Sequence, residues 1–119
     1  MRKTSPEHNF QVWTVNYLRW NGIYCFAVPN GGKRDVKTGA FLKKEGQLAG
    51  VADLILLLPE GEAIFVELKA GKNRQQESQR LFQKNVEKLG FNYLLWNQPQ
   101  DVIDFVKGVK AVIMGDFVE

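Results

Sequence analysis

Three charged residues stand beside two short apolar runs, where charge is costly to bury. Asp53 immediately precedes the run Leu54–Leu58, and Glu67 and Lys69 end a second run that begins at Ala63. Charged side chains in or beside buried strands are rare unless they are paired or bind a metal. Because Glu67 and Lys69 are two residues apart, both side chains project from one face of a strand. A hairpin of the two runs would bring all three groups to one end of a sheet.

This group of residues suits the hydrolysis of a phosphodiester bond. Asp53, Glu67 and the main-chain carbonyl of Leu68 can supply oxygen ligands to Mg²⁺ or Mn²⁺. Such an ion polarises the scissile phosphate and lowers the pKa of a bound water. Lys69 can orient that water or offset the charge of the transition state. The alternative is a structural Glu67–Lys69 pair with Asp53 capping a turn, and the presence of an aspartate on the preceding strand favours the functional interpretation.

His8 and Cys25 are the only histidine and the only cysteine of the chain. Their number excludes an internal disulfide and a Cys/His zinc site within one chain, and it disfavours a histidine-dependent nucleophile. A metal would therefore need carboxylate ligands, which favours a hard ion. Cys25 lies in a strand-like run, so we expect a buried, inert thiol.

The length of 119 residues predicts one domain over residues 1–119, built around a single core. Hydrophobic residues make up 45% of the chain and charged residues 24%, which indicates a globular rather than a disordered protein. The longest apolar stretch, Leu54–Leu58, is too short to cross a bilayer, and charges interrupt the N-terminus where a signal peptide would be apolar. We therefore expect a cytoplasmic protein that is not bound to a membrane.

Basic residues gather in two clusters, within a formal net charge of +3. Such clusters commonly neutralise nucleic-acid phosphates, although a solvated, mobile loop is an equally common alternative. The residues predicted to contact DNA are Lys33, Arg34, Lys37, Lys43, Lys44, Lys72 and Arg74.

The apolar pattern predicts an α/β fold, with a small mixed β-sheet flanked by helices. Helices are expected over residues 6–20, 73–89 and 100–106, with a short one near 41–45 in the polar connection 33–50. Strands are expected over residues 23–28, 51–58, 63–69 and 93–96, and a last short one over 111–114. The spacing of Phe10, Trp13, Tyr17 and Trp20 predicts the core-facing stripe of the first helix.

The loop of the central hairpin decides whether Asp53 and Glu67 can share an ion. Because strand side chains alternate, a two-residue turn at Glu60 and Gly61 would put them on opposite faces. An odd-numbered loop, such as residues 60–62, pairs Asp53 with Lys69 and Ile55 with Glu67, which restores the common face. We expect such an odd loop, or a bulge, in this hairpin.

The motifs together resemble the PD-(D/E)xK nuclease superfamily and, within it, the virus-type replication-repair nuclease (VRR-NUC) domain. The matching stretches are PNGG at 29–32, LKKEG at 42–46, AGVAD at 49–53, FVELK at 65–69 and SQ at 78–79. The likeness spans about residues 5 to 107. The family often has proline before the metal-binding aspartate, where this chain has Ala52, and that proline is not a ligand.

The resemblance implies a metal-dependent nuclease in which Asp53 and Glu67 are ligands and Lys69 is the catalytic lysine. It also implies roles for Glu7 on the first helix and Gln79 on the helix after the core. A capping box with Thr4 would explain Glu7 equally well. Gln79 is either a partner of the metal ligands or a satisfied core amide.

Free-standing domains of this branch, in phage and bacterial genomes, look like structure-specific endonucleases, including resolvases of four-way junctions. The resemblance therefore implies cleavage of branched DNA, and a homodimer, since one small chain cannot span both cleavage sites of a two-fold symmetric junction. Three alternatives remain: a restriction-type or general repair nuclease, a non-catalytic DNA-binding module on this scaffold, and an unrelated α/β interaction domain.

Overall fold

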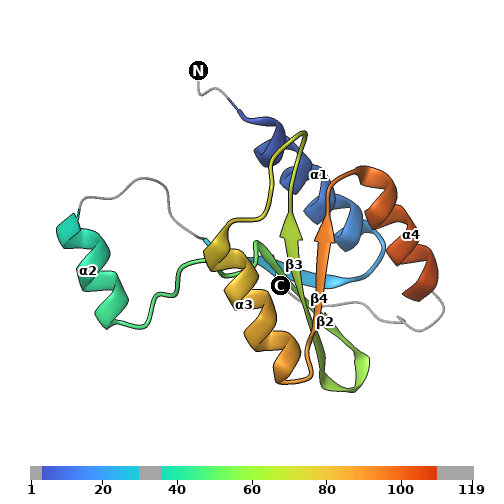
Figure 1. The fold of residues 1–119 in the computed structure, drawn as a ribbon. Coiled ribbons are helices and arrows are strands. Elements are labelled where there is room, and N and C mark those ends of the chain that lie inside the picture. Colours follow the sequence, from blue (N-terminus) through green and yellow to red (C-terminus); the bar gives the residue numbers. More distant parts are fainter. Residues whose placement is uncertain (1–3, 30–35, 110–119) are drawn as a thin grey trace.

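The computed structural model describes residues 4–29 and 36–109, which form a four-stranded sheet and four helices (Figure 1). In chain order the elements are α1 (Pro6–Trp20), β1 (Tyr24–Ala27), α2 (Val36–Lys44), β2 (Leu54–Leu58), the 3-10 turn η1 (Pro59–Gly61), β3 (Glu62–Leu68), α3 (Glu77–Lys88), β4 (Asn92–Trp96) and α4 (Pro99–Val109). The predicted α/β class is confirmed. Among the described residues, no helix is both long enough and apolar enough to cross a membrane.

The strands lie in the order β1-β2-β3-β4. The strand β2 pairs antiparallel with both β1 and β3, whereas β4 runs parallel to β3. The sheet is therefore mixed, as predicted. A parallel pair needs a crossover connection, and α3 supplies it between β3 and β4.

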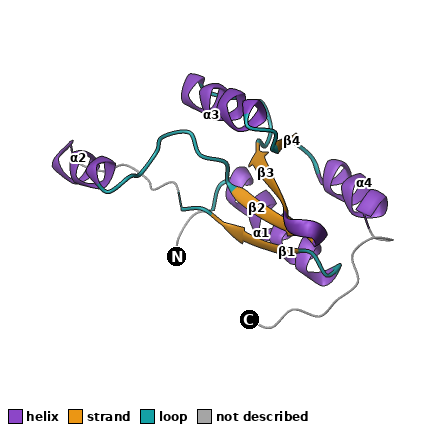
Figure 2. Cartoon of the chain, turned by 90° about the horizontal axis from the view of Figure 1, so that it is seen from below, coloured by secondary structure: helices purple, strands orange, loops and turns teal. Residues whose placement is uncertain are grey.

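Helices cover both faces of the sheet (Figure 2). On one face, α1 and α4 bury the larger core, to which they contribute Leu18, Val102 and Val106. On the other face, α3 packs over β3 and β4, where Val86 meets Tyr93. Alternation along β3 sends Val66 into the larger core and Glu67 toward α3.

The helix α1 begins where Ser5 caps it, with its hydroxyl accepting a 3.0 Å hydrogen bond from the His8 N–H. Its buried positions are Phe10, Thr14 and Leu18. The predicted aromatic stripe was therefore wrong in part, because Trp20 is 88% exposed and Trp13 36% exposed. Both stripes have helical spacing, and the small Thr14 side chain lets the helix approach the sheet more closely than an aromatic ring would.

Several element boundaries differ from the predicted ones. The helix α2 begins at Val36 rather than near residue 41, so part of the predicted loop is helical. The helix α3 begins at Glu77 rather than at residue 73, because the Gln76 N–H is satisfied by the Gln79 side chain at 2.7 Å. The predicted strand 111–114 lies outside the described residues. Cys25 is buried, as expected.

Candidate active site

The turn between β2 and β3 decides which side chains share a face. Leu58 pairs with Glu62 and Leu54 pairs with Val66, which leaves the three-residue loop Pro59–Gly61. The predicted odd-numbered loop is confirmed. It is formed by residues 59–61 rather than 60–62, because Pro59 opens a 3-10 turn that continues through Glu60 at a φ of 67°.

The shifted loop changes the predicted cross-strand partners. Ile55 lies opposite Phe65 rather than opposite Glu67, so that predicted pair was wrong. Continuing the same register by one residue places Asp53 opposite Glu67 instead of opposite Lys69. The common face is kept, because the register moved by two residues and the side-chain period is two.

Asp53 is held from both sides by neighbouring strands. Its main-chain carbonyl accepts a 2.9 Å hydrogen bond from the Val28 N–H. Its Oδ2 accepts a 2.7 Å hydrogen bond from the Leu68 N–H. Two short bonds to rigid strands fix the position of this carboxylate, which is what a pre-organised ligand needs.

Glu67 is the most enclosed charged group of the site, with 1% of its surface exposed. Lys69 is 7% exposed, and its Nζ lies 3.4 Å from Glu67 Oε2. The Gln79 side chain donates a 3.0 Å hydrogen bond to the same Oε2. Gln79 therefore contacts a carboxylate that we predict to be a metal ligand, and its role toward a metal stays a prediction.

Tyr93 and Gln75 also belong to this cluster, although neither was predicted from the sequence. The Tyr93 hydroxyl donates to Glu67 Oε1 at 3.4 Å and accepts from Gln75 Nε2 at 3.1 Å. Phe65 pairs with Tyr93, and Glu67 pairs with Leu95, so Tyr93 lies on the face of Glu67. A parallel register between the third and fourth strands was the missing information, and no local motif encodes it.

Burial and repulsion act together on Glu67. Burial, then the negative charge of Asp53 and the hydrogen bond between the two carboxyl groups, together raise the pKa of the Glu67 carboxyl to about 8. The Lys69 ammonium lowers this pKa by less. Burial and then the Glu67 charge likewise raise the pKa of Tyr93 above its ordinary range. Ionisation of both carboxyl groups would give the site more negative charge than one lysine can balance, so a divalent cation would stabilise the doubly ionised form.

The donor atoms fit a divalent ion with oxygen ligands. Asp53 and Glu67 offer two carboxylates on one face. In an extended strand the N–H and C=O of one residue point to the same side, so the Leu68 carbonyl faces the side on which its N–H meets Asp53. Over residues 4–29 and 36–109, no group of three or more His, Cys, Asp or Glu side chains could hold a metal. Water and phosphate oxygens would complete the coordination, as is usual for Mg²⁺.

Comparisons with known proteins give a consistent result at the level of structure. No family model matches the chain, and no curated protein matches it. Among solved structures, a "VRR_NUC domain protein" superposes with a TM-score of 0.71 at 20% identity over 98% of this chain and 96% of its own. A second structure, a "VRR_NUC domain", has a TM-score of 0.65 at 19% identity over 87% of this chain and 97% of its own.

The chain has the VRR_NUC fold. At these identities the likeness shows the fold, and the expected resemblance is confirmed at that level. The roles of Asp53, Glu67, Leu68, Lys69 and Gln79 stay predictions, although the structure places all of them in one cluster.

Glu7 occupies a different position from the one that a capping box would give it. Because Ser5 is the cap, the third helical residue is His8, and the interpretation of Glu7 as a capping-box partner of Thr4 was wrong. Glu7 Oε2 instead accepts a 3.3 Å hydrogen bond from Asn73 Nδ2. This contact joins the start of α1 to the segment that follows β3. Glu7 thus contacts the approach to the site rather than its carboxylates.

The predicted DNA-binding residues fall into separate groups. Lys33 and Arg34 lie outside the described residues. Lys37, Lys43 and Lys44 are on α2, which lies within the long connection between β1 and β2 and stands apart from the sheet (Figure 1). Lys72 and Arg74 are exposed in the segment between β3 and α3, beside the contact of Glu7 with Asn73.

The main chain at Gly50 packs closely against the start of α3, so a side chain at this position should destabilise the fold. At a φ of 83°, a Cβ here would collide with the main-chain carbonyl of Ser78 and stand 2.8 Å from the Gln79 nitrogen. We expect Gly50→Ala to lower the free energy of unfolding by about 2–4 kcal/mol, since strain and overpacking add. Gly46→Ala is the matched control, because its φ is 102° and nothing lies within 4 Å. It should cost only about 1 kcal/mol. Equal losses in urea denaturation would contradict the close contact.

Proposed function

We propose that this protein is a divalent-metal-dependent DNA endonuclease that hydrolyses phosphodiester bonds. The observation that carries the proposal is the buried Glu67 carboxylate, which faces Asp53 and lies 3.4 Å from the Lys69 ammonium. A buried pair of carboxylates beside a lysine is costly for a structural role and useful for holding an ion against a phosphate. The VRR_NUC fold supports the same activity.

Separate residues would bind the metal, compensate charge and position the ligands during hydrolysis. Asp53, Glu67 and the Leu68 carbonyl would hold Mg²⁺ or Mn²⁺, which supplies Lewis-acid stabilisation of the phosphate and activates water when bound. Lys69 projects from the face of Glu67 and offsets the negative charge that develops on the phosphate, or orients the attacking water. Gln79 holds Glu67 Oε2 in place through its 3.0 Å hydrogen bond, so the carboxylate does not need to reorganise.

The substrate that we propose is branched DNA, with four-way junctions as the leading case. A homodimer would place two copies of the site on the two strands that a symmetric junction presents for cleavage. The lysines of α2 stand away from the sheet, where they could reach DNA beyond the cleavage site. The resemblance to free-standing domains of phage and bacterial genomes supports a DNA-processing role of that kind. A general repair or restriction-type nuclease, or a non-catalytic DNA-binding module, would use the same scaffold.

Cleavage of a DNA panel tests the proposal. Four-way junction, flap, nicked and linear duplexes would be incubated with Mg²⁺ or Mn²⁺ and with EDTA. We expect metal-dependent cleavage. The rate should be at least ~10-fold higher on a branched substrate, because only such a substrate presents two strands to the two sites of a dimer. Asp53→Asn, which keeps the shape of the side chain, is the control and should be inactive. Cleavage in EDTA or by Asp53→Asn would contradict the mechanism, and binding without cleavage would indicate the DNA-binding module.

A further inference from the structure

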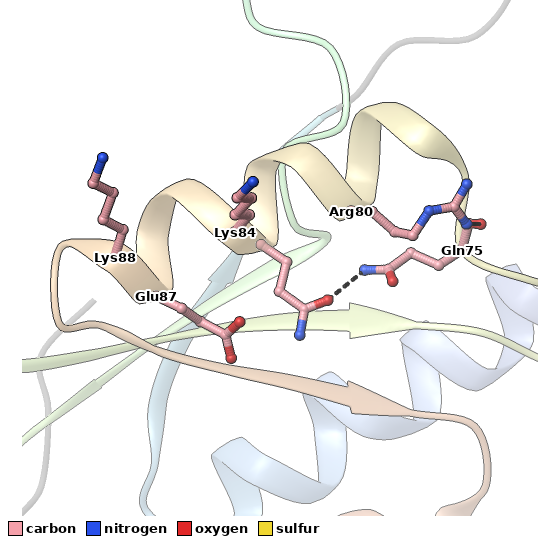
Figure 3. Close-up of a pocket in the computed structure, with 6 residues that line it drawn as sticks. Gln75, Arg80, Lys84, Glu87 and Lys88 are labelled. Atoms are coloured by element: carbon pink, nitrogen blue, oxygen red, sulfur yellow. Dashed lines mark hydrogen bonds between the residues drawn. The ribbon is translucent and has the colours of Figure 1, made fainter.

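A basic groove is lined by residues of α3 and by Gln75, which precedes the helix, and it lies outside the acidic cluster of Asp53 and Glu67. It has a volume of about 740 Å³, and its lining residues are Gln75, Arg80, Gln83, Lys84, Glu87 and Lys88. Figure 3 shows Arg80, Lys84 and Lys88 following one another along the helix. Three cations against one carboxylate give the groove a net positive charge.

The spacing of these cations matches a linear polyanion. Arg80, Lys84 and Lys88 are four residues apart, so they form one row along the helix. Each step rises ~6 Å, and the row extends over ~12 Å. Successive phosphates along one nucleic-acid strand are separated by a similar distance. A strand laid along the row could therefore place one phosphate near each cation.

Among the residues that the structure describes, the cations form no ion pair with the acidic residues of their own helix, Glu77 and Glu87. Lysine or arginine on a solvated helix face is commonly paired with a glutamate four residues before it. The residues four before Arg80, Lys84 and Lys88 are Gln76, Arg80 and Lys84. In the part of the chain that the structure describes, Lys69 forms an ion pair with Glu67, and Arg80, Lys84 and Lys88 form no ion pair. Unpaired positive charge in a groove is suited to an anionic partner.

Hydrogen bonds join the groove to the acidic cluster. Gln75 donates a 2.9 Å hydrogen bond to Gln83 within the groove (Figure 3) and a 3.1 Å hydrogen bond to Tyr93. Tyr93 in turn donates to Glu67. Arg80 is anchored at the head of the row by a 2.6 Å hydrogen bond to the Gln75 carbonyl. The row therefore starts beside the candidate active site and leads away from it.

We infer that the α3 groove binds the phosphate backbone of a DNA strand that leads away from the cleavage site. This inference rests on the proposed function and adds a contact surface to it. The groove holds the strand by charge alone, so it contributes affinity and alignment without base preference. One phosphate near each of the three cations corresponds to three successive nucleotides of one strand.

Binding measurements over a range of salt concentrations test the inference without requiring cleavage. In EDTA, fluorescence anisotropy would compare the wild type with the triple variant Arg80→Gln, Lys84→Gln, Lys88→Gln on a labelled junction. We expect the affinity at about 0.1 M salt to fall ~10-fold and the salt slope to decrease by roughly 2–3, since each phosphate contact contributes about 0.9. Glutamine is a good helix former and the positions are exposed, so the fold should persist.

A matched pair of single substitutions separates the groove from overall charge. Lys84→Gln and Lys107→Gln each remove one charge from an exposed helical lysine, in α3 and α4 respectively. The salt slope should decrease by about 0.9 for Lys84→Gln and stay unchanged for Lys107→Gln. Lys84→Arg should keep the wild-type slope.

The outcomes distinguish this inference from the proposed function. Equal affinity and slope in the triple variant and the wild type would overturn the groove, while metal-dependent cleavage would still support the nuclease. Equal effects of Lys84→Gln and Lys107→Gln would also overturn it. With Mg²⁺ present, the triple variant should raise KM and leave kcat unchanged. A wild-type protein that cleaves no DNA but loses salt dependence when the groove is mutated would overturn the proposed nuclease activity and support DNA binding by the groove.

Discussion

Lys69→Met should abolish cleavage while the protein still binds both DNA and a divalent ion. Methionine keeps the length and the apolar stem of a side chain that is 7% exposed, and it removes only the ammonium group. We expect kcat to fall by about 10²–10⁴-fold, the usual range for a group that acts on the transition state. KM for DNA should change little, because Lys69 is enclosed beside Glu67 rather than displayed to the duplex.

Two comparisons make the Lys69 result specific. Asp53→Ala and Glu67→Ala should lose cleavage together with Mn²⁺ binding, whereas Lys69→Met should keep Mn²⁺ binding in calorimetric titration. Removing the ammonium also removes the interaction that lowers the pKa of Glu67, so the titration should be made above pH 8. Lys72→Met is the control, because Lys72 is exposed three residues further along the chain. A Lys69→Met protein that cleaves within a few-fold of the wild-type rate would refute the assignment of this residue.

The residues of the acidic cluster could be predicted because their chemistry is local. Asp53, Glu67 and Lys69 interrupt or flank apolar strands. Because side chains alternate between the two faces of a strand, their spacing predicts that Glu67 and Lys69 share a face. The register could not be predicted from the same pattern. It depends on Pro59 opening the turn and on Glu60 taking a positive φ, which a residue other than glycine rarely does.

Contacts between distant segments were harder to predict. Tyr93 reaches Glu67 only because β4 lies parallel to β3 in one particular register. Glu7 bonds to Asn73, far along the chain, once Ser5 rather than Thr4 caps α1. The spacing of the aromatic residues in α1 also predicted the wrong core-facing stripe in part, since Thr14 is buried and Trp20 is exposed. In each case tertiary packing overrode a pattern that was correct about secondary structure.

In the absence of metal, the protein should become less stable as pH rises from about 5 to 8, and Glu67→Gln should remove this dependence. The pKa of Glu67 is about 8 in the folded protein, against an ordinary value of 4.5. Between these values the folded state retains a proton that the unfolded state releases, so raising the pH favours unfolding. The stabilisation is complete below 4.5 and is lost as pH approaches 8. At about 1.4 kcal/mol for each pKa unit, the loss should be a few kcal/mol.

Glu67→Gln separates this effect from the rest of the protein. The amide has nearly the shape of the carboxyl, can accept the hydrogen bond from Gln79 and can donate to Asp53, and it carries no charge to bury. In EDTA at pH 8.5, the variant should therefore exceed the wild type in free energy of unfolding by a few kcal/mol, although it should not cleave DNA. Glu62→Gln, at the exposed end of the same strand, is the control and should keep the wild-type pH dependence.

Urea denaturation at pH 5, 7 and 8.5, with EDTA or with saturating Mg²⁺, would measure both dependences. Mg²⁺ requires the ionised carboxylate, so its binding should release about one proton below pH 8 and gain up to tenfold in affinity per pH unit. The stability of the metal-bound wild type should then vary much less with pH than that of the metal-free protein. A metal-free wild type whose stability is flat or rises between pH 5 and 8 would show that Glu67 is ionised without a cation. The argument that burial and Asp53 prepare this site for a divalent ion would then fail, whatever the cleavage assays show.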